Sequence, residues 1–131
     1  MGVAVCIETP TKFSRKTCAY NATIPKGTIL KATTPNTVSA ASADNDIYGG
    51  IAWMEKSIND ATTEITVALD GVWAILCSAG AITIGQDVVI SGANLITAYG
   101  TLDGEKGAVV GKAMEAGAGS TVIMVRNNCL I

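Results

Sequence analysis

The most reactive side chains of this 131-residue sequence are four cysteines, Cys6, Cys18, Cys77 and Cys129. No two of them form a Cys-x-x-Cys pair, and the sequence contains no histidine, so the usual zinc-binding patterns are missing. An even number of cysteines allows two disulfides in any of three pairings, or buried thiols that pack as small hydrophobic side chains. Because the first residues lack the cationic start of a secretion signal, we expect synthesis in a reducing cytoplasm, and hence thiols.

The absence of histidine also removes most routes to catalysis. Ser-His-Asp and Cys-His activation of a nucleophile need an imidazole, and so does the usual general base near neutral pH. Carboxylate, lysine or cysteine chemistry stays open, but no local sequence points to it. We therefore predict that the protein is not an enzyme and that it uses no metal and no other cofactor.

Two short segments approach known ligand-binding motifs. Gly104–Ala113 resembles a phosphate-binding loop, but Lys106 stands where that loop needs a glycine, and Ala113 lacks the hydroxyl that would hold magnesium. Residues 44–46 begin like a calcium loop, but the glycine and the distal glutamate of such a loop are missing. We expect the first segment to be a strand bracketed by glycines and the second to be a solvated turn.

The N-terminal segment, residues 1–19, differs in charge from the rest of the chain. Its balance is +2, from Glu8 against Lys12, Arg15 and Lys16, whereas residues 20–131 balance at −4 and the whole chain at −2. Such a segment is either an arm that touches another molecule or an edge strand with a solvated basic face. On the first interpretation, which we adopt as the expectation, residues 1–19 are an arm on a β-domain of residues 20–131. Lys12, Arg15 and Lys16 would then dock on carboxylates around an apolar anchor, Phe13.

Two tryptophans, Trp53 and Trp73, lie beside strand-like runs. Each is either an interface anchor, because tryptophan is enriched at interaction hot spots, or a core residue. We expect no nucleic-acid partner, because Phe13 is the single aromatic residue among the basic residues of the N-terminal segment and the net charge is −2. We expect no membrane partner, because no apolar run approaches the roughly 20 residues of a membrane span.

The elements that must position these residues are predicted to be strands. The sequence has 14 Ile, 11 Val and 15 Thr against only 6 Leu, and β-branched residues favour pleated, half-buried strands. No segment keeps a 3.6-residue period, so long helices are not expected. Asp70-Gly71 between two apolar runs predicts a hairpin. Strands are expected near residues 28–33, 37–40, 47–54, 64–69, 71–76, 87–91, 95–99, 107–115 and 121–126.

From residue 20 onward the order of features repeats. Residues 26–40 align without gaps onto residues 84–98 at an offset of 58, with Gly27 on Gly85 and Asn36 on Asn94. Two later matches have offsets of 61 and 57, namely Gly50–Ala52 with Gly111–Ala113 and Ile65–Ala68 with Val122–Val125. We therefore predict an all-β fold, a compact β-barrel or β-sandwich of short antiparallel strands. Two similar β-units would pack as one core behind the N-terminal arm.

The glycine-led apolar motifs of the chain carry a family resemblance. They are Lys26–Leu30, Gly50–Ala52, Gly71–Trp73, Gly85–Val88, Val110–Ala116 and Ser120–Val125. With them, residues 22–126, about 80% of the chain, resemble the small capsid cement, or head decoration, proteins of tailed bacteriophages. Residues 1–19 and the tryptophan and cysteine content depart from that pattern.

This resemblance implies a non-enzymatic structural protein of the virion. Family members sit on the outside of an expanded capsid, usually as trimers at local threefold positions, and bridge neighbouring capsid subunits. The implied partners are the major capsid protein and further copies of this chain, as a homotrimer. The implied location is the capsid exterior, after synthesis in the host cytoplasm. The alternative is a ligand-binding β-module, such as a carbohydrate-binding domain of a phage tail or fibre, with aromatic residues clustered in surface loops.

Overall fold

The structure, a computed structural model, describes residues 2–44, 46–59, 62–78, 80–100 and 105–129. They form eleven strands and one 3-10 helix: β1 (Val5–Glu8), β2 (Phe13–Thr17), β3 (Ile29–Thr34), β4 (Thr37–Ala40), β5 (Tyr48–Ala52), β6 (Glu64–Ala68), β7 (Val72–Cys77), β8 (Asp87–Ile90), β9 (Leu95–Ala98), η1 (Glu105–Ala108), β10 (Val109–Ala113) and β11 (Val122–Asn127). Strands β3 to β11 lie where the sequence predicted them. Within the described residues, no helix is long and apolar enough to cross a membrane.

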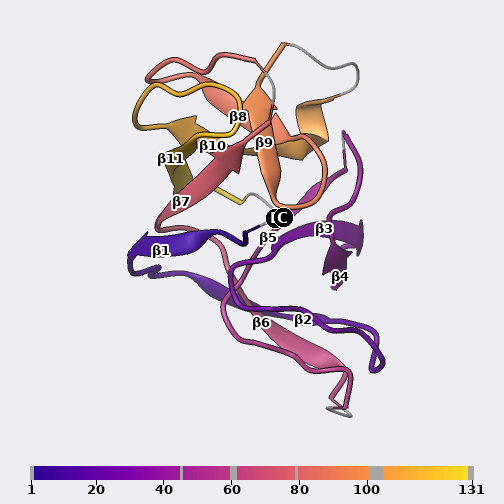
Figure 1. Cartoon of the computed structure of the whole chain (residues 1–131). Coiled ribbons are helices and arrows are strands. Elements are labelled where there is room, and N and C mark those ends of the chain that lie inside the picture. Colours follow the sequence, from indigo (N-terminus) through magenta and orange to yellow (C-terminus); the bar gives the residue numbers. More distant parts are fainter. Residues whose placement is uncertain (1, 45, 60–61, 79, 101–104, 130–131) are drawn as a thin grey trace.

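The strands close into two barrels that lie end to end (Figure 1). The first barrel has the strand order β2-β4-β3-β5-β6, closed by the pairing of β2 with β6. The second has the order β7-β9-β8-β10-β11, and β1 is added outside it along β7. The predicted all-β fold of two similar β-units is confirmed.

Backbone hydrogen bonds show that the two barrels are one topology used twice. In each barrel the first strand along the chain pairs in parallel with the third, β2 with β4 and β7 with β9. The other pairs within each barrel are antiparallel. The Gly27 N–H donates to the Ala52 carbonyl at 2.8 Å, and the Gly85 N–H donates to the Ala113 carbonyl at the same distance.

The connections differ in length. Residues 41–47 become 99–108 before the fourth strand, and 53–63 become 114–121 after it, so the offset rises from 58 to 61 and returns to 58. The sequence alignment of Ile65 with Val122 is therefore one residue out of register, because the strand pairings place Glu64 on Val122.

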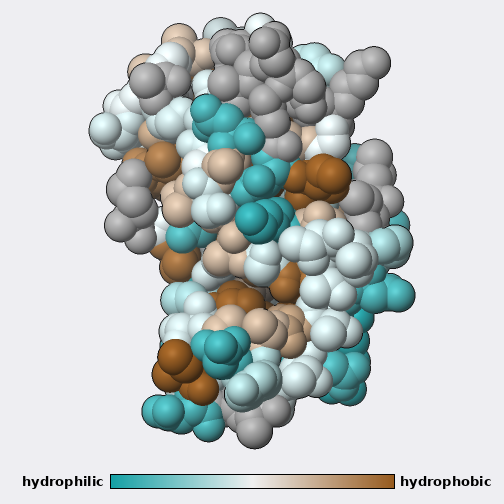
Figure 2. All heavy atoms as spheres, turned by 90° about the vertical axis from the view of Figure 1, so that its right-hand side faces the viewer, coloured by the Kyte–Doolittle hydropathy of each residue, from teal (hydrophilic) through white to brown (hydrophobic). Residues whose placement is uncertain are grey.

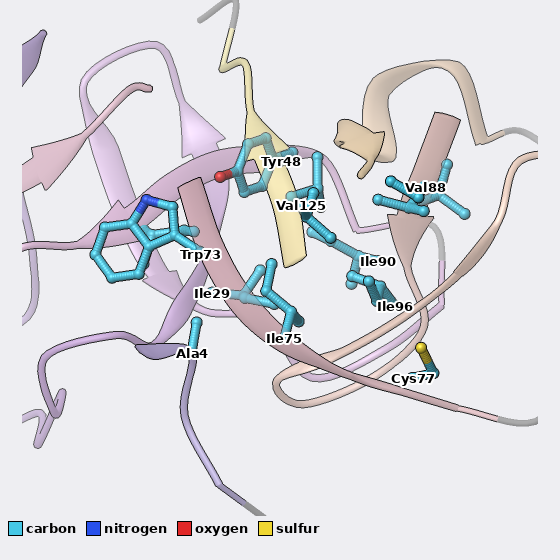
Figure 3. Close-up of a cluster of buried hydrophobic side chains, with 14 of the residues drawn as sticks. Ala4, Ile29, Tyr48, Trp73, Ile75, Cys77, Val88, Ile90, Ile96 and Val125 are labelled. Carbon is cyan, nitrogen blue, oxygen red and sulfur yellow. The ribbon is translucent and has the colours of Figure 1, made fainter. Parts of the chain in front are cut away.

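The two barrels have cores of unequal size. The first encloses a small cluster of buried residues, Cys18, Ile24, Leu30, Val38, Ala52, Ile65 and Val67. The second encloses a larger cluster that continues across the junction onto Ile29 and Tyr48 of the first barrel (Figure 3). The junction between the barrels is therefore part of the second barrel's core, and the two units fold around a shared apolar interior.

Asp70-Gly71 joins the barrels and does not form the hairpin that the sequence predicted. Strand β6 pairs with β2 and β5, whereas β7 pairs with β1, β9 and β11, so the two strands beside this dipeptide do not pair with each other. Closure of each barrel occupies both edges of these strands, and this overrides the local turn preference. Gly71 has a φ of 92°, and a Cβ on it would lie 2.8 Å from the Glu8 carbonyl oxygen, so the approach of the N-terminal segment requires glycine.

Asn127 fixes this junction from the end of the last strand. Its amide nitrogen donates to the carbonyls of Ala68 (3.3 Å) and Asp70 (3.2 Å), and its oxygen accepts from the Tyr48 hydroxyl. Burial raises the pKa of Tyr48 well above its usual value, so this hydroxyl stays a donor. A buried polar group thus has all its partners, and it ties the linker to both barrels.

The structure corrects the prediction that the N-terminal segment is an arm. Strand β2 is an integral strand of the first barrel, antiparallel to β6 over five residue pairs, and β1 pairs with β7 of the second barrel. Residues 1–19 are therefore not an arm in front of a separate β-domain, and residue 19 marks no boundary. The alternative, an edge strand with a solvated basic face, is met only in part: β1 is an edge strand but carries no basic residue, and Lys12, Arg15 and Lys16 lie in or directly before β2. Charge alone could not distinguish the two, because a strand with one solvated face can carry the same basic residues.

Candidate interaction surface

The structure separates the four docking candidates of the N-terminal segment. Lys12, Phe13 and Arg15 lie at the surface, and the Arg15 guanidinium is 3.3 Å from the Glu64 carboxylate across the β2–β6 pair. Lys16 points into the first barrel, where only 7% of it is exposed and its ammonium donates to the Pro35 carbonyl at 3.0 Å. Alternation along a strand sends neighbouring side chains to opposite faces, so Lys16 is not available as a docking residue.

The predicted anchors Trp53 and Trp73 form one aromatic row with Phe13. The Phe13 and Trp53 ring centroids are 5.4 Å apart, and Trp53 meets Trp73 edge to face at 6.1 Å. Trp73 has no exposed surface, and its indole N–H donates to the Asp70 carbonyl at 3.1 Å, so it belongs to the core and is not an interface anchor. Phe13 keeps 44% of its surface exposed, and Trp53 is half-buried.

A cation that the sequence interpretation missed completes this surface. The Lys26 ammonium lies 4.1 Å from the Trp53 ring centroid, a cation–π distance. We call Phe13, Lys26 and Trp53 the aromatic patch. Its members come from β2, from the turn before β3 and from the end of β5, so no local spacing could reveal it. The patch offers an apolar anchor beside a positive charge, which suits a partner surface with both apolar and carboxylate groups.

Asp70 holds the chain that presents the aromatic patch. Its carboxylate accepts from the Thr11 N–H at 2.7 Å, the Thr11 hydroxyl at 2.6 Å and the Lys12 N–H at 3.0 Å. Burial raises the pKa of this carboxyl, but the hydrogen bonds from Thr11 and Lys12 outweigh that effect, so the pKa is lowered overall. The linker between the barrels therefore positions the start of β2, where Phe13 begins the patch.

A cavity of about 720 Å³ beside the junction is the other candidate site. Its lining includes Tyr48, Asp87, Lys112 and Asn127. The charges of Asp87 and Lys112 are paired with each other at 2.7 Å, and the Tyr48 hydroxyl is bonded to Asn127. Tyr48, only 2% exposed, is the single aromatic residue of this lining. The cavity thus offers no open aromatic face on which a sugar ring could stack.

The aromatic patch and the described lining of the cavity contain no cysteine. The four cysteines all lie within the described residues and form no disulfide. Burial raises the pKa values of Cys6 and Cys77, which lowers the reactivity of their thiols. Within the described ranges, no group of His, Cys, Asp and Glu side chains could hold a metal ion.

Comparison with known proteins shows a fold shared with a phage protein of known structure. No protein-family model matches the sequence, and no curated protein matches it. Among solved structures, the chain is similar to the head fiber gp8.5 N base of bacteriophage phi29, with a TM-score of 0.50 and 12% sequence identity. The match covers 89% of this chain and 93% of the other. At this identity the likeness shows that the two chains share a fold.

Proposed function

We propose that the protein is a structural component of a phage virion, a decoration or cement protein on the outside of the capsid that bridges major capsid subunits. The observation that carries the proposal is the fold shared over nearly the whole chain with a phage head fiber base. The family resemblance of the glycine-led motifs leads to the same class of protein independently. The sequence has no histidine, and the described residues contain no metal-binding cluster, so neither feature supports an enzyme.

The aromatic patch is the proposed docking site on the shell. Phe13 has 44% of its surface left to bury, so its burial against a capsid subunit would contribute about 1 kcal/mol per copy, roughly half of the value for a fully exposed side chain. Lys26, together with Lys12 and Arg15 on either side of Phe13 in the sequence, would bind carboxylates of the capsid surface. Exposed ion pairs contribute only about 0–1 kcal/mol each, so these charges mainly set the rate of approach and its salt dependence.

Self-association would multiply these contributions. As a homotrimer on a local threefold axis, the protein would present three aromatic patches to three capsid subunits. Once the first patch is bound, the other two bind at a high effective concentration, so modest contacts give tight occupancy. A closed ring of copies also matches the closed symmetry of the site.

The test is co-sedimentation with phage heads that lack the protein, comparing expanded with unexpanded shells. Phe13→Ser should reduce occupancy of expanded heads at least tenfold, with the melting temperature recorded for each variant to verify the fold. Ile84→Ser is the matched control, because Ile84 is 72% exposed in the second barrel, outside the patch. Wild-type protein that fails to bind expanded heads would refute the proposal.

A carbohydrate-binding module is the second candidate, and one observation favours it. Phe13 and Trp53 lie 5.4 Å apart with Phe13 44% exposed, so the pair could stack on a sugar ring. Against it, the Lys26 ammonium already lies on the Trp53 ring. Binding to a glycan array that disappears in Phe13→Ser, together with absent head binding, would favour this candidate over the decoration role.

A further inference from the structure

The outer faces of the two barrels differ in chemistry at equivalent positions. The registers of β2 with β6 and of β7 with β11 define the equivalence. Two outward pairs of the first barrel are polar, Thr17 with Glu64 and Arg15 with Thr66, and the third is Phe13 with Ala68. The corresponding pairs of the second barrel are Leu76 with Val122, Ala74 with Met124, and Val72 with Arg126. At two of these three positions the outer face is therefore polar in the first barrel and apolar in the second.

Strand β1 extends this apolar face. Val5 pairs with Ala74, which pairs in turn with Met124, so the three side chains form one row across three strands. Val5 is 60% exposed, Ile7 52% and Val122 54%. We define the outer apolar face as Val5, Ala74, Leu76, Val122 and Met124; Ile7 follows along β1 at the register shift between Cys6 and Glu8. Exposed apolar side chains that are contiguous on a sheet mark interaction surfaces, whereas scattered ones do not.

The opposite side of the molecule gives a useful contrast. Figure 2 views the side on which β3 and β4 lie in Figure 1, and there hydrophobic residues form small patches separated by polar ones. The outer apolar face, by contrast, follows three neighbouring strands without a polar residue between its rows.

Two further features of this face show which partner fits. Among the described strands, β1 pairs only with β7, so its other edge still offers backbone donors and acceptors to a strand. At the rim, the Arg126 guanidinium lies 3.7 Å from the Glu8 carboxylate, and both side chains are more than half exposed. A face with an open strand edge, apolar side chains and one charge of each sign suits further copies of the same chain, which can all turn this face toward one symmetry axis. A second copy supplies the same edge, the same apolar side chains and the opposite charges.

We propose that the outer apolar face is a self-association surface, and that its occupant is a second copy of this chain. In a closed oligomer this face turns toward the symmetry axis, and the outer face of the first barrel stays outside the contact between copies. The proposal deepens the self-association part of the proposed function, but it does not depend on a capsid partner.

The test copies residues of the first barrel onto the second. Val122→Glu introduces the residue of the equivalent position, Glu64, and Ala74→Arg with Val122→Glu also introduces the partner of the Arg15–Glu64 ion pair. Both changes are compatible with the topology, because the first barrel carries them. Ile84→Glu is the matched control, a β-branched residue exposed to 72% but outside the face.

The readout is molar mass by sedimentation equilibrium over micromolar concentrations, with thermal unfolding as the check on folding. We expect wild type and Ile84→Glu to form the same homo-oligomer, Val122→Glu to weaken it at least tenfold, and the double variant to be a folded monomer. A monomeric wild type, or a folded double variant that associates as wild type does, overturns the proposal. Head binding is scored separately, so an oligomer that dissociates as expected but ignores phage heads refutes the capsid role alone.

Discussion

The two barrels share a topology but differ in how much polar chemistry they tolerate. The inner position that Ile75 fills in the second barrel holds Lys16 in the first, as the two strand registers show. At the end of each barrel, an isolated bridge joins Ile24 with Lys56 in the first and Ile82 with Gly117 in the second. The first barrel therefore buries two lysines where the second has an isoleucine and a glycine.

The lysines are possible because backbone carbonyls bind them. Lys56 is 2% exposed, and its ammonium donates to the carbonyls of Tyr20 (2.8 Å), Ala22 (3.3 Å) and Ser57 (3.4 Å). In the second barrel, a Cβ on Gly117 would lie 2.3 Å from Cγ2 of Ile123, so packing leaves no room for a side chain. The comparison teaches that the second barrel holds the apolar centre of the molecule, while the first barrel has a smaller apolar core and is stabilised in part by polar contacts.

The largest expected effect comes from giving the second barrel a first-barrel residue at its centre. Trp73 is equivalent to Ser14, since Ser14 pairs with Val67 and Trp73 with Val125. Trp73→Ser should lower the free energy of unfolding by about 3–5 kcal/mol, because it leaves a large cavity in the shared core. Urea denaturation followed by circular dichroism measures the change. Ser14→Ala, the matched change in the first barrel, should cost less than about 1 kcal/mol, and equal costs would contradict the comparison.

A smaller effect is expected from the buried lysine of the first barrel. Lys56→Ala removes the donor of three carbonyls and a large buried side chain, and should cost about 2–4 kcal/mol. Lys56→Met keeps the length and apolar stem, so it should cost about 1–2 kcal/mol less than alanine. Chemical denaturation of both variants distinguishes the contributions. If Lys56→Met were more stable than wild type, the ammonium would not stabilise the first barrel.

The junction should be less sensitive than either core. Asn127→Ala leaves the Tyr48 hydroxyl and the carbonyls of Ala68 and Asp70 without their partner, at a cost of about 1–3 kcal/mol. Tyr48→Phe removes the hydroxyl donor alone and leaves the amide bonded to the carbonyls of Ala68 and Asp70, so it separates the two contributions. Differential scanning calorimetry also shows whether the barrels still unfold in one transition. An unchanged melting temperature in Asn127→Ala would mean that the apolar junction alone holds the barrels together.

The sequence predicted the strands well because each depends on local composition. All nine strands from β3 to β11 were expected from β-branched runs bounded by turns, and the repeat indicated two similar units. The errors have one cause, which is pairing over long sequence distances. Asp70-Gly71 carries a hairpin signal, but the partners of β6 and β7 lie elsewhere in the chain. Likewise the N-terminal segment was interpreted from its charge, whereas its pairing with β6 and β7 makes it strands β2 and β1.

The candidate site was predictable in part for the same reason. Phe13 and Trp53 were singled out by residue type, and the fold brings them into contact. Lys26 was missed because its place on the Trp53 ring follows from the barrel and not from any motif. Lys16 was selected by charge, although its position in the strand alternation turns it inward. The contrast between the outer faces could be found only from the strand registers, because the equivalent residues of the two barrels are too different in type to be matched in the sequence.

The smallest expected effect is a pH dependence at the linker. The lowered pKa of Asp70 means that its hydrogen bonds to Thr11 and Lys12 stabilise the fold fully above the unfolded-state pKa of about 4. This stabilisation is lost as the pH falls through the lower pKa of the folded state. Asp70→Asn should therefore be less stable than wild type at neutral pH, by under about 1 kcal/mol because water screens the carboxylate.

Denaturation of the Asp70→Asn variant and wild type between neutral pH and acid measures this effect. The difference in the free energy of unfolding should shrink as the pH falls below about 4, since protonated aspartic acid and asparagine are both neutral. Thr11→Val, which removes one of the three donors to the carboxylate, should show a smaller difference with the same direction of pH dependence. A difference that stays constant from neutral pH into acid would mean that Asp70 stabilises the start of β2 through its shape and not through its charge.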